Sequence, residues 1–158
     1  MLRVTASRLE TYLMATVLFD TSIFIAYKPI RLPAGFLMSA VVIQELAAGA
    51  ADNSVLKGLD AVRIAYERNG KLVVPTSEDW WLAGKVLNSL YRGLKSKSRG
   101  RVQRIAKLEQ QRIIRDVLIA RSAKRANALL ITNNVSDFAK ISRFCRVNFT
   151  SGLDYFRR

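Results

Sequence analysis

The sequence predicts an α/β protein in which helices cover both faces of a parallel sheet. Short apolar runs alternate along the chain with longer runs whose apolar residues recur at helical spacing. This alternation is typical of strand–helix–strand units, in which the strands pair in parallel and are buried on both faces. The chain has 158 residues, half of them hydrophobic, which is enough for one domain with its own core.

The first half of the chain is expected to contain three strands and three helices. In chain order we expect a strand over 17–19, a helix over 21–27, a strand over 36–38, helices over 40–48 and 54–68, and a strand over 72–74. Asp20 and Ser39 are residue types that cap helix N-termini, so each is placed before a helix. Asn69-Gly70 is a typical helix end and closes the third helix.

The second half is expected to add two long helices, a short helix and two strands. In chain order we expect helices over 77–92 and 101–126, a strand over 128–131, a helix over 134–141 and a strand over 146–149. Thr76 and Asp79, three residues apart, resemble a capping box at the start of the first of these helices. We expect one domain over 17–158. Residues 1–16 form an N-terminal extension whose status the sequence leaves open, because Met14 is an alternative start.

Composition excludes several kinds of chemistry. The chain has no histidine, which excludes Ser-His-Asp triads, Cys-His pairs and histidine ligation of metals. Its single cysteine excludes an intrachain disulfide and a thiolate zinc cluster, and fits a reducing cytoplasm. The net charge of +14 favours a polyanionic partner such as nucleic acid. No segment has the roughly 20 apolar residues of a membrane span, so we expect a cytoplasmic protein without membrane attachment.

Four acidic residues stand out because apolar neighbours surround them: Asp20, Glu45, Asp116 and Asp137. Each has an ordinary structural explanation when it is taken alone. Asp20 and Asp137 each follow a predicted strand and suit the N-cap of the next helix. Glu45 suits the solvent-facing side of an amphipathic helix, and Asp116 suits an ion pair with an arginine of its own helix.

Considered together, the four carboxylates predict a metal site. Ligand sites of open parallel sheets form outside the carboxyl ends of the strands, and all four residues are placed to reach that edge. Unpaired carboxylates about 4 Å apart repel by roughly 4 kcal/mol per pair at an effective dielectric constant of 20, so such a cluster needs a cation. Oxygen ligands without His or Cys favour Mg²⁺ or Mn²⁺.

Three segments of the sequence also match a known family. DTSIFIAY, SAVVIQELAAG and RDVLIARSAKRANALLITNNVSDF resemble the PIN-domain ribonucleases, especially the VapC-like toxins of type II toxin–antitoxin systems. The resemblance runs from about Val17 to Phe149. Its most specific part is the pattern D-x-x-I-A followed by T-x-N-x-x-D-F, which Asp116 to Ala120 and Thr132 to Phe138 satisfy.

The resemblance implies a three-layer α/β/α sandwich around a central parallel sheet of four to five strands. It implies that the catalytic, metal-binding residues are Asp20, Glu45, Asp116 and Asp137, with Mg²⁺ or Mn²⁺ as cofactor. The polar groups that would support them are Thr21, Ser22, Thr132 and Asn134. The implied activity is endonucleolytic cleavage of RNA, and the implied protein partners are a cognate antitoxin and a second copy of the chain.

A basic stretch leads directly to Asp116. From Arg92 to Arg115 there are nine Lys or Arg and one acidic residue, Glu109. It fits either a phosphate-binding rim or a solvated helix face, and we favour the rim because of its position. The candidate RNA-binding residues are Lys95, Lys97, Arg99, Arg101, Arg104, Arg112 and Arg115. Trp80 and Trp81 have the chemistry to stack on bases, but we expect both in the core.

Two other functions are compatible with the same residues. A catalytically silent, nucleic-acid-binding PIN-like module would keep the basic rim, but it is expected to have lost one of the four acids, and none is missing. A housekeeping PIN nuclease would act without an antitoxin. A haloacid-dehalogenase-like phosphatase is disfavoured because that chemistry needs an aspartate where Ser22 stands.

Overall fold

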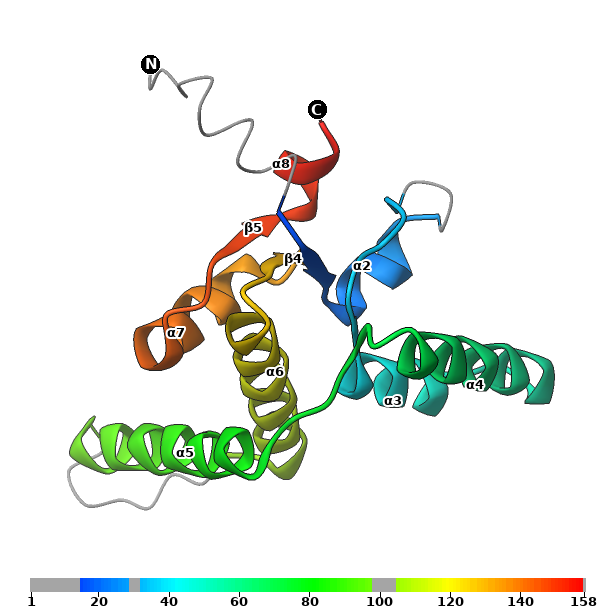
Figure 1. Cartoon of the computed structure of the whole chain (residues 1–158). Helices are drawn as coiled ribbons and strands as arrows, with labels where there is room; N and C mark the ends of the chain where they lie inside the picture. Colours follow the sequence, from blue (N-terminus) through cyan, green and yellow to red (C-terminus); the bar gives the residue numbers. More distant parts are fainter. Residues whose placement is uncertain (1–14, 29–31, 98–104, 158) are drawn as a thin grey trace, which may run out of the picture.

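The fold is taken from a computed structural model, which describes residues 15–28, 32–97 and 105–157, with only the backbone of 95–97. Most of the expected extension 1–16 therefore lies outside the described residues. The elements are β1 (Val17–Phe19), α2 (Thr21–Ala26), β2 (Met38–Ser39), α3 (Ala40–Ala48), α4 (Asn53–Arg68), β3 (Leu72–Val73), α5 (Ser77–Lys97), α6 (Lys107–Arg125), β4 (Leu129–Thr132), α7 (Val135–Cys145), β5 (Phe149–Ser151) and α8 (Gly152–Phe156) (Figure 1). None of the described helices is long and apolar enough to cross a membrane.

The strands are all parallel, as predicted. They pair in the orders β1-β4-β5 and β2-β3, and a single bridge between Leu18 and Leu37 brings the two groups together. The spatial order is therefore β3-β2-β1-β4-β5. The chain moves outward on one side of β1 and then returns to the other side, so the strand order reverses between β1 and β4. The carboxyl ends of these two strands are where a ligand site is expected in such a sheet.

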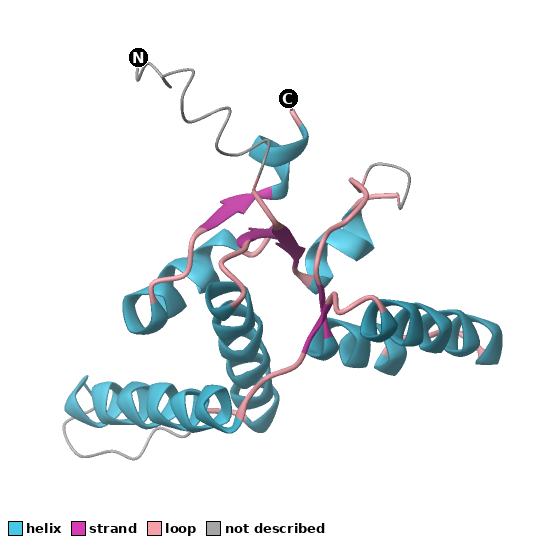
Figure 2. Ribbon diagram, viewed as in Figure 1, coloured by secondary structure: helices cyan, strands magenta, loops and turns pink. Residues whose placement is uncertain are grey.

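Helices cover both faces of the sheet, which confirms the three-layer α/β/α architecture (Figure 2). Neighbouring residues of a strand point to opposite faces. Leu18 and Leu130 pack in the larger core cluster with buried residues of α3, α5, α6 and α7. Phe19 and Ile131 face the other way and form a second cluster with Ile23 of α2 and aromatic residues of α8.

The last part of the chain differs from the sequence prediction. The helix expected over 134–141 continues to Cys145, and the final strand is Phe149–Ser151 rather than 146–149. Arg146 explains the shift, because it adopts the left-handed conformation (φ 47°) that closes a helix. The chain can become extended only after this turn. The short helix α8 was not predicted.

The tryptophan pair is exposed, so the expectation that both lie in the core was wrong. The side chains of Trp80 and Trp81 are 56% and 72% exposed. The buried side of α5 is instead formed by Asp79, Ala83 and Val86. These three positions are four and three residues apart and share one helix face. Trp80 and Trp81 therefore lie on the sides of the helix that face away from the core.

Asp79 connects α5 to the end of α6. The predicted capping box is present, because the Asp79 carboxylate accepts from the Thr76 N–H and the Thr76 hydroxyl accepts from the Asp79 N–H. The same buried carboxylate pairs with Arg121 at 3.2 Å and Arg125 at 3.0 Å. Burial alone would raise its pKa, but the Thr76 N–H and Arg125 outweigh burial and hold the pKa below its usual value.

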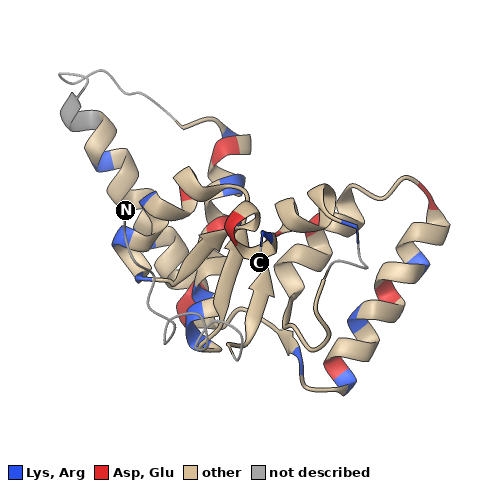
Figure 3. Cartoon of the chain, turned by 90° about the horizontal axis from the view of Figure 1, so that it is seen from above, with Lys and Arg blue, Asp and Glu red and all other residues tan. Residues whose placement is uncertain are grey.

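Helix α4 lies at the periphery of the molecule. None of its residues is fully buried. Basic and acidic positions alternate along it, as the helix at the right of Figure 3 shows. Arg63 pairs there with Asp60 at 2.8 Å and with Glu67 at 3.0 Å. Exposed helical pairs of this kind add only a few tenths of a kcal/mol each, about 0.3–0.5, so α4 offers sites for control substitutions.

Candidate active site

The four acidic residues predicted as ligands are brought to one end of the sheet. Asp20 directly follows β1, and Asp137 lies in the first turn of the helix that follows β4. Glu45 lies in the helix after β2, and Asp116 lies in the middle of α6. Burial, together with the charges of Asp20, Glu45 and Asp137, raises the pKa of Asp116 to about 7, against the opposing effect of Arg112.

Strand pairing positions Asp20. Phe19 of β1 is in register with Ile131 of β4, and the Asp20 N–H donates to the Ile131 carbonyl at 2.9 Å. This places Asp20, only 5% exposed, beside Thr132 at the end of β4. The Thr132 and Ser22 hydroxyls both donate to Asp20 Oδ2, each at 2.8 Å. One carboxylate oxygen is thereby held in a fixed direction.

Neither Asp20 nor Asp137 caps a helix with its side chain, so those interpretations were wrong. Asp20 occupies the N-cap position of α2, but the Ile23 N–H bonds to its backbone carbonyl and not to its carboxylate. The N-cap of α7 is Asn134, and Asp137 lies inside the first turn. Both carboxylates remain available for interactions at the sheet edge.

Two arginines of α6 hold the other two carboxylates. Arg112 Nη1 lies 3.1 Å from Asp137 Oδ2, and Arg115 Nε lies 2.9 Å from Glu45 Oε1. Glu45 also accepts a short hydrogen bond from the Thr21 hydroxyl, and its side chain is 20% exposed, so it does not face solvent as the ordinary explanation required. An ion pair with an arginine of its own helix was the ordinary explanation for Asp116. Arg112 and Arg115 instead form their ion pairs with Asp137 and Glu45.

The donor chemistry suits a hard cation, because the acids and hydroxyls gathered here offer oxygen. Among the described residues, however, no three His, Cys, Asp or Glu side chains are arranged to hold one ion as they stand. Two of the four carboxylates are engaged by guanidinium groups instead. Glu45 is paired with Arg115, and Asp137 is paired with Arg112 and, at 3.5 Å, with Lys140.

The predicted supporting residues take part in different ways. Thr21, Ser22 and Thr132 each donate a hydroxyl to one of the acids. Asn134 participates through its backbone N–H, which donates to the Thr132 hydroxyl at 2.9 Å. The sequence reasoning missed Asn133, whose N–H donates to the Ser22 hydroxyl at 3.0 Å. Its position inside the T-x-N-x-x-D-F pattern was the available indication.

The predicted basic rim is only partly within the described structure. Lys95 and Lys97 lie in the last turn of α5, of which the backbone is described. Arg99, Arg101 and Arg104 lie outside the described residues. The side chains of Arg112 and Arg115 are described, and they contact Asp137 and Glu45.

Gly152 supports this network from α8 and predicts a stability effect. A Cβ at this position would lie 2.6 Å from Asn133 Oδ1 and 2.8 Å from Ile23 Cδ1. Gly152→Ala is therefore expected to destabilise the protein by about 1–3 kcal/mol, as overpacked substitutions do. Gly58→Ala, where nothing lies within 4 Å, is the control and is expected to stabilise helix α4 by up to about 1 kcal/mol. Urea unfolding of both variants tests this, and equal effects would contradict it.

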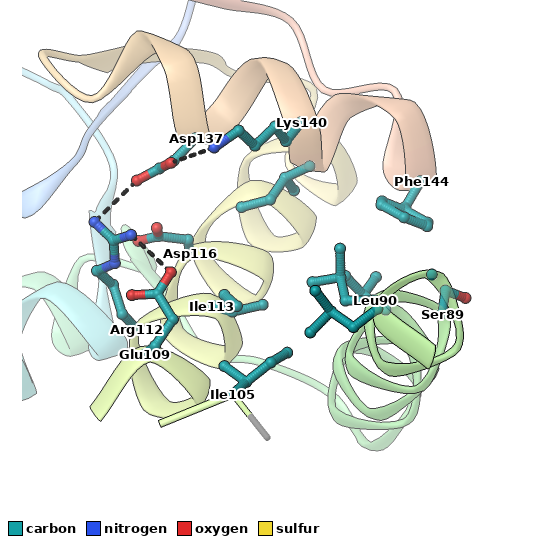
Figure 4. A pocket seen from close by; sticks show the side chains of 14 residues that line it. Ser89, Leu90, Ile105, Glu109, Arg112, Ile113, Asp116, Asp137, Lys140 and Phe144 are labelled. Carbon is teal, nitrogen blue, oxygen red and sulfur yellow. Dashed lines mark hydrogen bonds and ion pairs between the residues drawn. The ribbon is translucent and has the colours of Figure 1, made fainter. Parts of the chain in front are cut away.

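An apolar cavity adjoins the acidic residues between α5, α6 and α7 (Figure 4). Its volume is about 350 Å³. Leu90, Ile113 and Phe144 line its apolar end, and Asp116 and Asp137 lie at the other. Figure 4 also shows Arg112 between Glu109 and Asp137 at that end.

No family model matches the sequence, and no curated protein matches it. Solved structures do. The structure of VapBC-1 from nontypeable Haemophilus influenzae is 25% identical, with a TM-score of 0.50, over 86% of this chain and 97% of that one. The structure of FitAB bound to the IR36 DNA fragment is 15% identical, with a TM-score of 0.53, over 86% and 94%. VapBC-5 from Mycobacterium tuberculosis, described as a member of the VapBC family of toxin-antitoxin systems, is 21% identical over 87% and 97%, with a TM-score of 0.44.

The chain has the fold of a VapC-like PIN domain. In this PIN fold, the acids follow β1 and β4 at the point where the strand order reverses. The prediction made from the three sequence segments is thus confirmed for the fold.

Proposed function

We propose that this protein is a metal-dependent endoribonuclease and the toxin of a toxin–antitoxin pair. The observation that supports this most is the gathering of four acids at one sheet edge, with Asp20 and Asp116 buried; burial and the neighbouring carboxylates raise the pKa of Asp116. Four acids at one sheet edge repel one another and so lower the stability of the fold, but the same negative charge attracts cations. Metal-assisted hydrolysis needs no histidine, which agrees with the composition.

Each acid has a distinct place in the proposed site. Asp20 and Asp116 are buried and would hold Mg²⁺ or Mn²⁺, joined by Glu45 and Asp137 from the flanking helices. A bound divalent ion supplies a Lewis acid for the phosphate and activates water. The chain's own part is to fix the direction of the donors, and Thr132 does this by its hydrogen bond to Asp20. The basic side chains near the site would bind the phosphates of the RNA.

Removal of the metal is expected to abolish cleavage. Wild-type protein incubated with single-stranded RNA and Mg²⁺ should give cleaved products. An excess of EDTA should lower the cleavage rate by at least about 100-fold, because the metal stabilises the transition state by several kcal/mol. Excess Mn²⁺ should restore it. Products that form equally well in EDTA would contradict the proposal. RNA binding without cleavage in Mg²⁺ or Mn²⁺ would instead indicate the catalytically silent module.

The proposed partner is an antitoxin that inserts an apolar segment into the cavity between α5, α6 and α7. The names VapBC and FitAB likewise each join two protein names. The cavity offers an apolar end beside charged residues, which suits a segment carrying both kinds of side chain. A second copy of the chain and a cytoplasmic location belong to the same proposal. A small reading frame next to the gene, encoding a DNA-binding protein, would support the toxin, and its absence would favour the housekeeping nuclease.

A further inference from the structure

We propose that Arg112 and Arg115 are positioning residues that neutralise the acidic site until a divalent cation and RNA displace them together. This inference rests on the proposed function and describes how the same site is regulated. It concerns two side chains that the sequence placed on a basic rim and that the structure places on acids. Three features of these contacts lead to it.

The first feature is where the arginines reach from α6. They lie four residues and one residue before Asp116, so one helix carries a buried carboxylate and two cations. Both cations extend to other elements. Arg112 reaches Asp137 of α7 at 3.1 Å, and Arg115 reaches Glu45 of α3 at 2.9 Å. Two of the four carboxylates are thereby neutralised within the chain, and in this state no three acids of the described residues are arranged around one ion.

The second feature is that both contacts are replaceable. Arg112 is 48% exposed and keeps a hydrogen bond to Glu109 at 2.8 Å, so it retains a partner if Asp137 leaves. Arg115 is 34% exposed, and its Nε is close to Glu45 but makes no hydrogen bond in acceptable geometry. Asp137 and Glu45 are only 17% and 20% exposed, but both guanidinium groups are partly open to water, which screens their attraction to the acids. A divalent ion that gains several carboxylates at once can therefore displace them.

The third feature is what a released guanidinium can bind. Its planar fork matches two oxygens of a phosphate. RNA that binds beside the acids would draw Arg112 and Arg115 away from Asp137 and Glu45, which frees both carboxylates for the ion. The ion, in turn, would release both arginines for RNA. By thermodynamic linkage each ligand then raises the affinity of the other by the same factor.

The first test measures Mn²⁺ binding without RNA by isothermal titration calorimetry. The proteins compared are the wild type, the double variant Arg112→Gln with Arg115→Gln, and the control Arg63→Gln on α4. We expect the double variant to bind Mn²⁺ about 5-fold more tightly or better, with Arg63→Gln unchanged. Thermal melts establish that each protein is folded. Unchanged or weaker Mn²⁺ binding by the folded double variant would overturn the inference, as would a wild type that binds no Mn²⁺.

The second test measures the coupling between cation and RNA. Fluorescence anisotropy follows the binding of a labelled single-stranded RNA in EDTA and in Ca²⁺ at equal ionic strength, because phosphate contacts depend on salt. A gel verifies that the RNA stays intact. We expect Ca²⁺ to tighten RNA binding by the wild type and to have no such effect on the double variant. The double variant could instead bind RNA more weakly than the wild type by the same factor in EDTA and in Ca²⁺. In that case the arginines are ordinary surface contacts, and the proposed exchange of arginines for a cation at the acids is wrong.

These tests are separable from the test of the proposed function. Asp20→Asn is the reference that should lose Mn²⁺ binding. A wild type that binds Mn²⁺ but cleaves no RNA would contradict the nuclease, while the Mn²⁺ affinities would still decide the exchange. Conversely, Mg²⁺-dependent cleavage combined with equal Mn²⁺ affinities would keep the nuclease and exclude the exchange.

Discussion

Asp116→Asn is expected to abolish RNA cleavage and, at the same time, to stabilise the metal-free protein. Cleavage should fall by at least about 100-fold, because an essential charge of the proposed metal site is lost. Stability should rise because the ionised carboxylate is costly where it lies, among Asp20, Glu45 and Asp137. The opposite signs of the two effects distinguish a functional acid from a structural one.

The stability gain depends on pH in a defined direction. The pKa of Asp116 is raised from 3.8 to about 7 in the folded protein. A raised pKa of an acid means that the folded state holds the proton more tightly, so the cost of Asp116 is absent below pH 3.8. It grows between pH 3.8 and 7 and is constant above that. With each pKa unit worth about 1.4 kcal/mol and part of the gain lost to burying an amide, we expect about 1–3 kcal/mol at pH 8.

Urea unfolding in EDTA at pH 4, 6 and 8 tests this effect. The difference between Asp116→Asn and the wild type should be near zero at pH 4 and largest at pH 8. Asp60→Asn, on the exposed face of α4, should change stability by no more than about 0.5 kcal/mol at any of these pH values. An Asp116→Asn protein that is less stable than the wild type at pH 8 would contradict the description of the site.

Asp79→Ala is expected to cost about 2–4 kcal/mol of stability without removing any proposed ligand. Its buried carboxylate joins the start of α5 to Arg121 and Arg125 at the end of α6. Removing this carboxylate takes the buried anion away from both arginines, which is strongly destabilising. The N-terminal cap of α5 is lost as well, because the Thr76 N–H donates to this carboxylate.

The pH dependence of this effect is opposite to that of Asp116. The folded-state pKa of Asp79 lies below its ordinary value, so its contribution is present above pH 3.8 and disappears as the pH falls through the folded pKa. The wild type should therefore lose its advantage over Asp79→Ala in acid. Glu78→Ala is the matched control, because Glu78 is exposed and contacts Arg121 only at 3.9 Å. If Asp79→Ala loses no more stability than Glu78→Ala at pH 7, Asp79 does not hold the α5–α6 contact.

The sheet and the edge at which the acids gather were predictable from the sequence, because both depend on local patterns of apolar and acidic residues. The strand around Leu18 and the strand around Leu130 are short apolar runs with acids just beyond them. Parallel pairing then places those acids at one end of the sheet. The capping box of Thr76 and Asp79 was predictable for a similar reason, since it is a local contact.

Contacts between elements were not predictable in the same way. Nothing local distinguishes an arginine that faces water from one that reaches Glu45 on another helix, so Arg115 was placed on a rim. The buried face of α5 begins at Asp79, and a charged residue there is a poor indicator of the core side. Trp80 and Trp81 were therefore assigned to the wrong side of the helix. The late start of β5 depended on the left-handed turn at Arg146, a residue type that seldom adopts it.

The most direct measurement compares cleavage of single-stranded RNA by the wild type and by Asp20→Asn, each with Mg²⁺ and each in EDTA. Asn keeps an oxygen that can accept from Ser22 and Thr132, so the variant should fold while losing the charge that a cation needs. We predict cleavage by the wild type with Mg²⁺ and a rate at least about 100-fold lower in the other three reactions. Cleavage that survives both the substitution and the chelator would contradict a metal-dependent nuclease built on these acids.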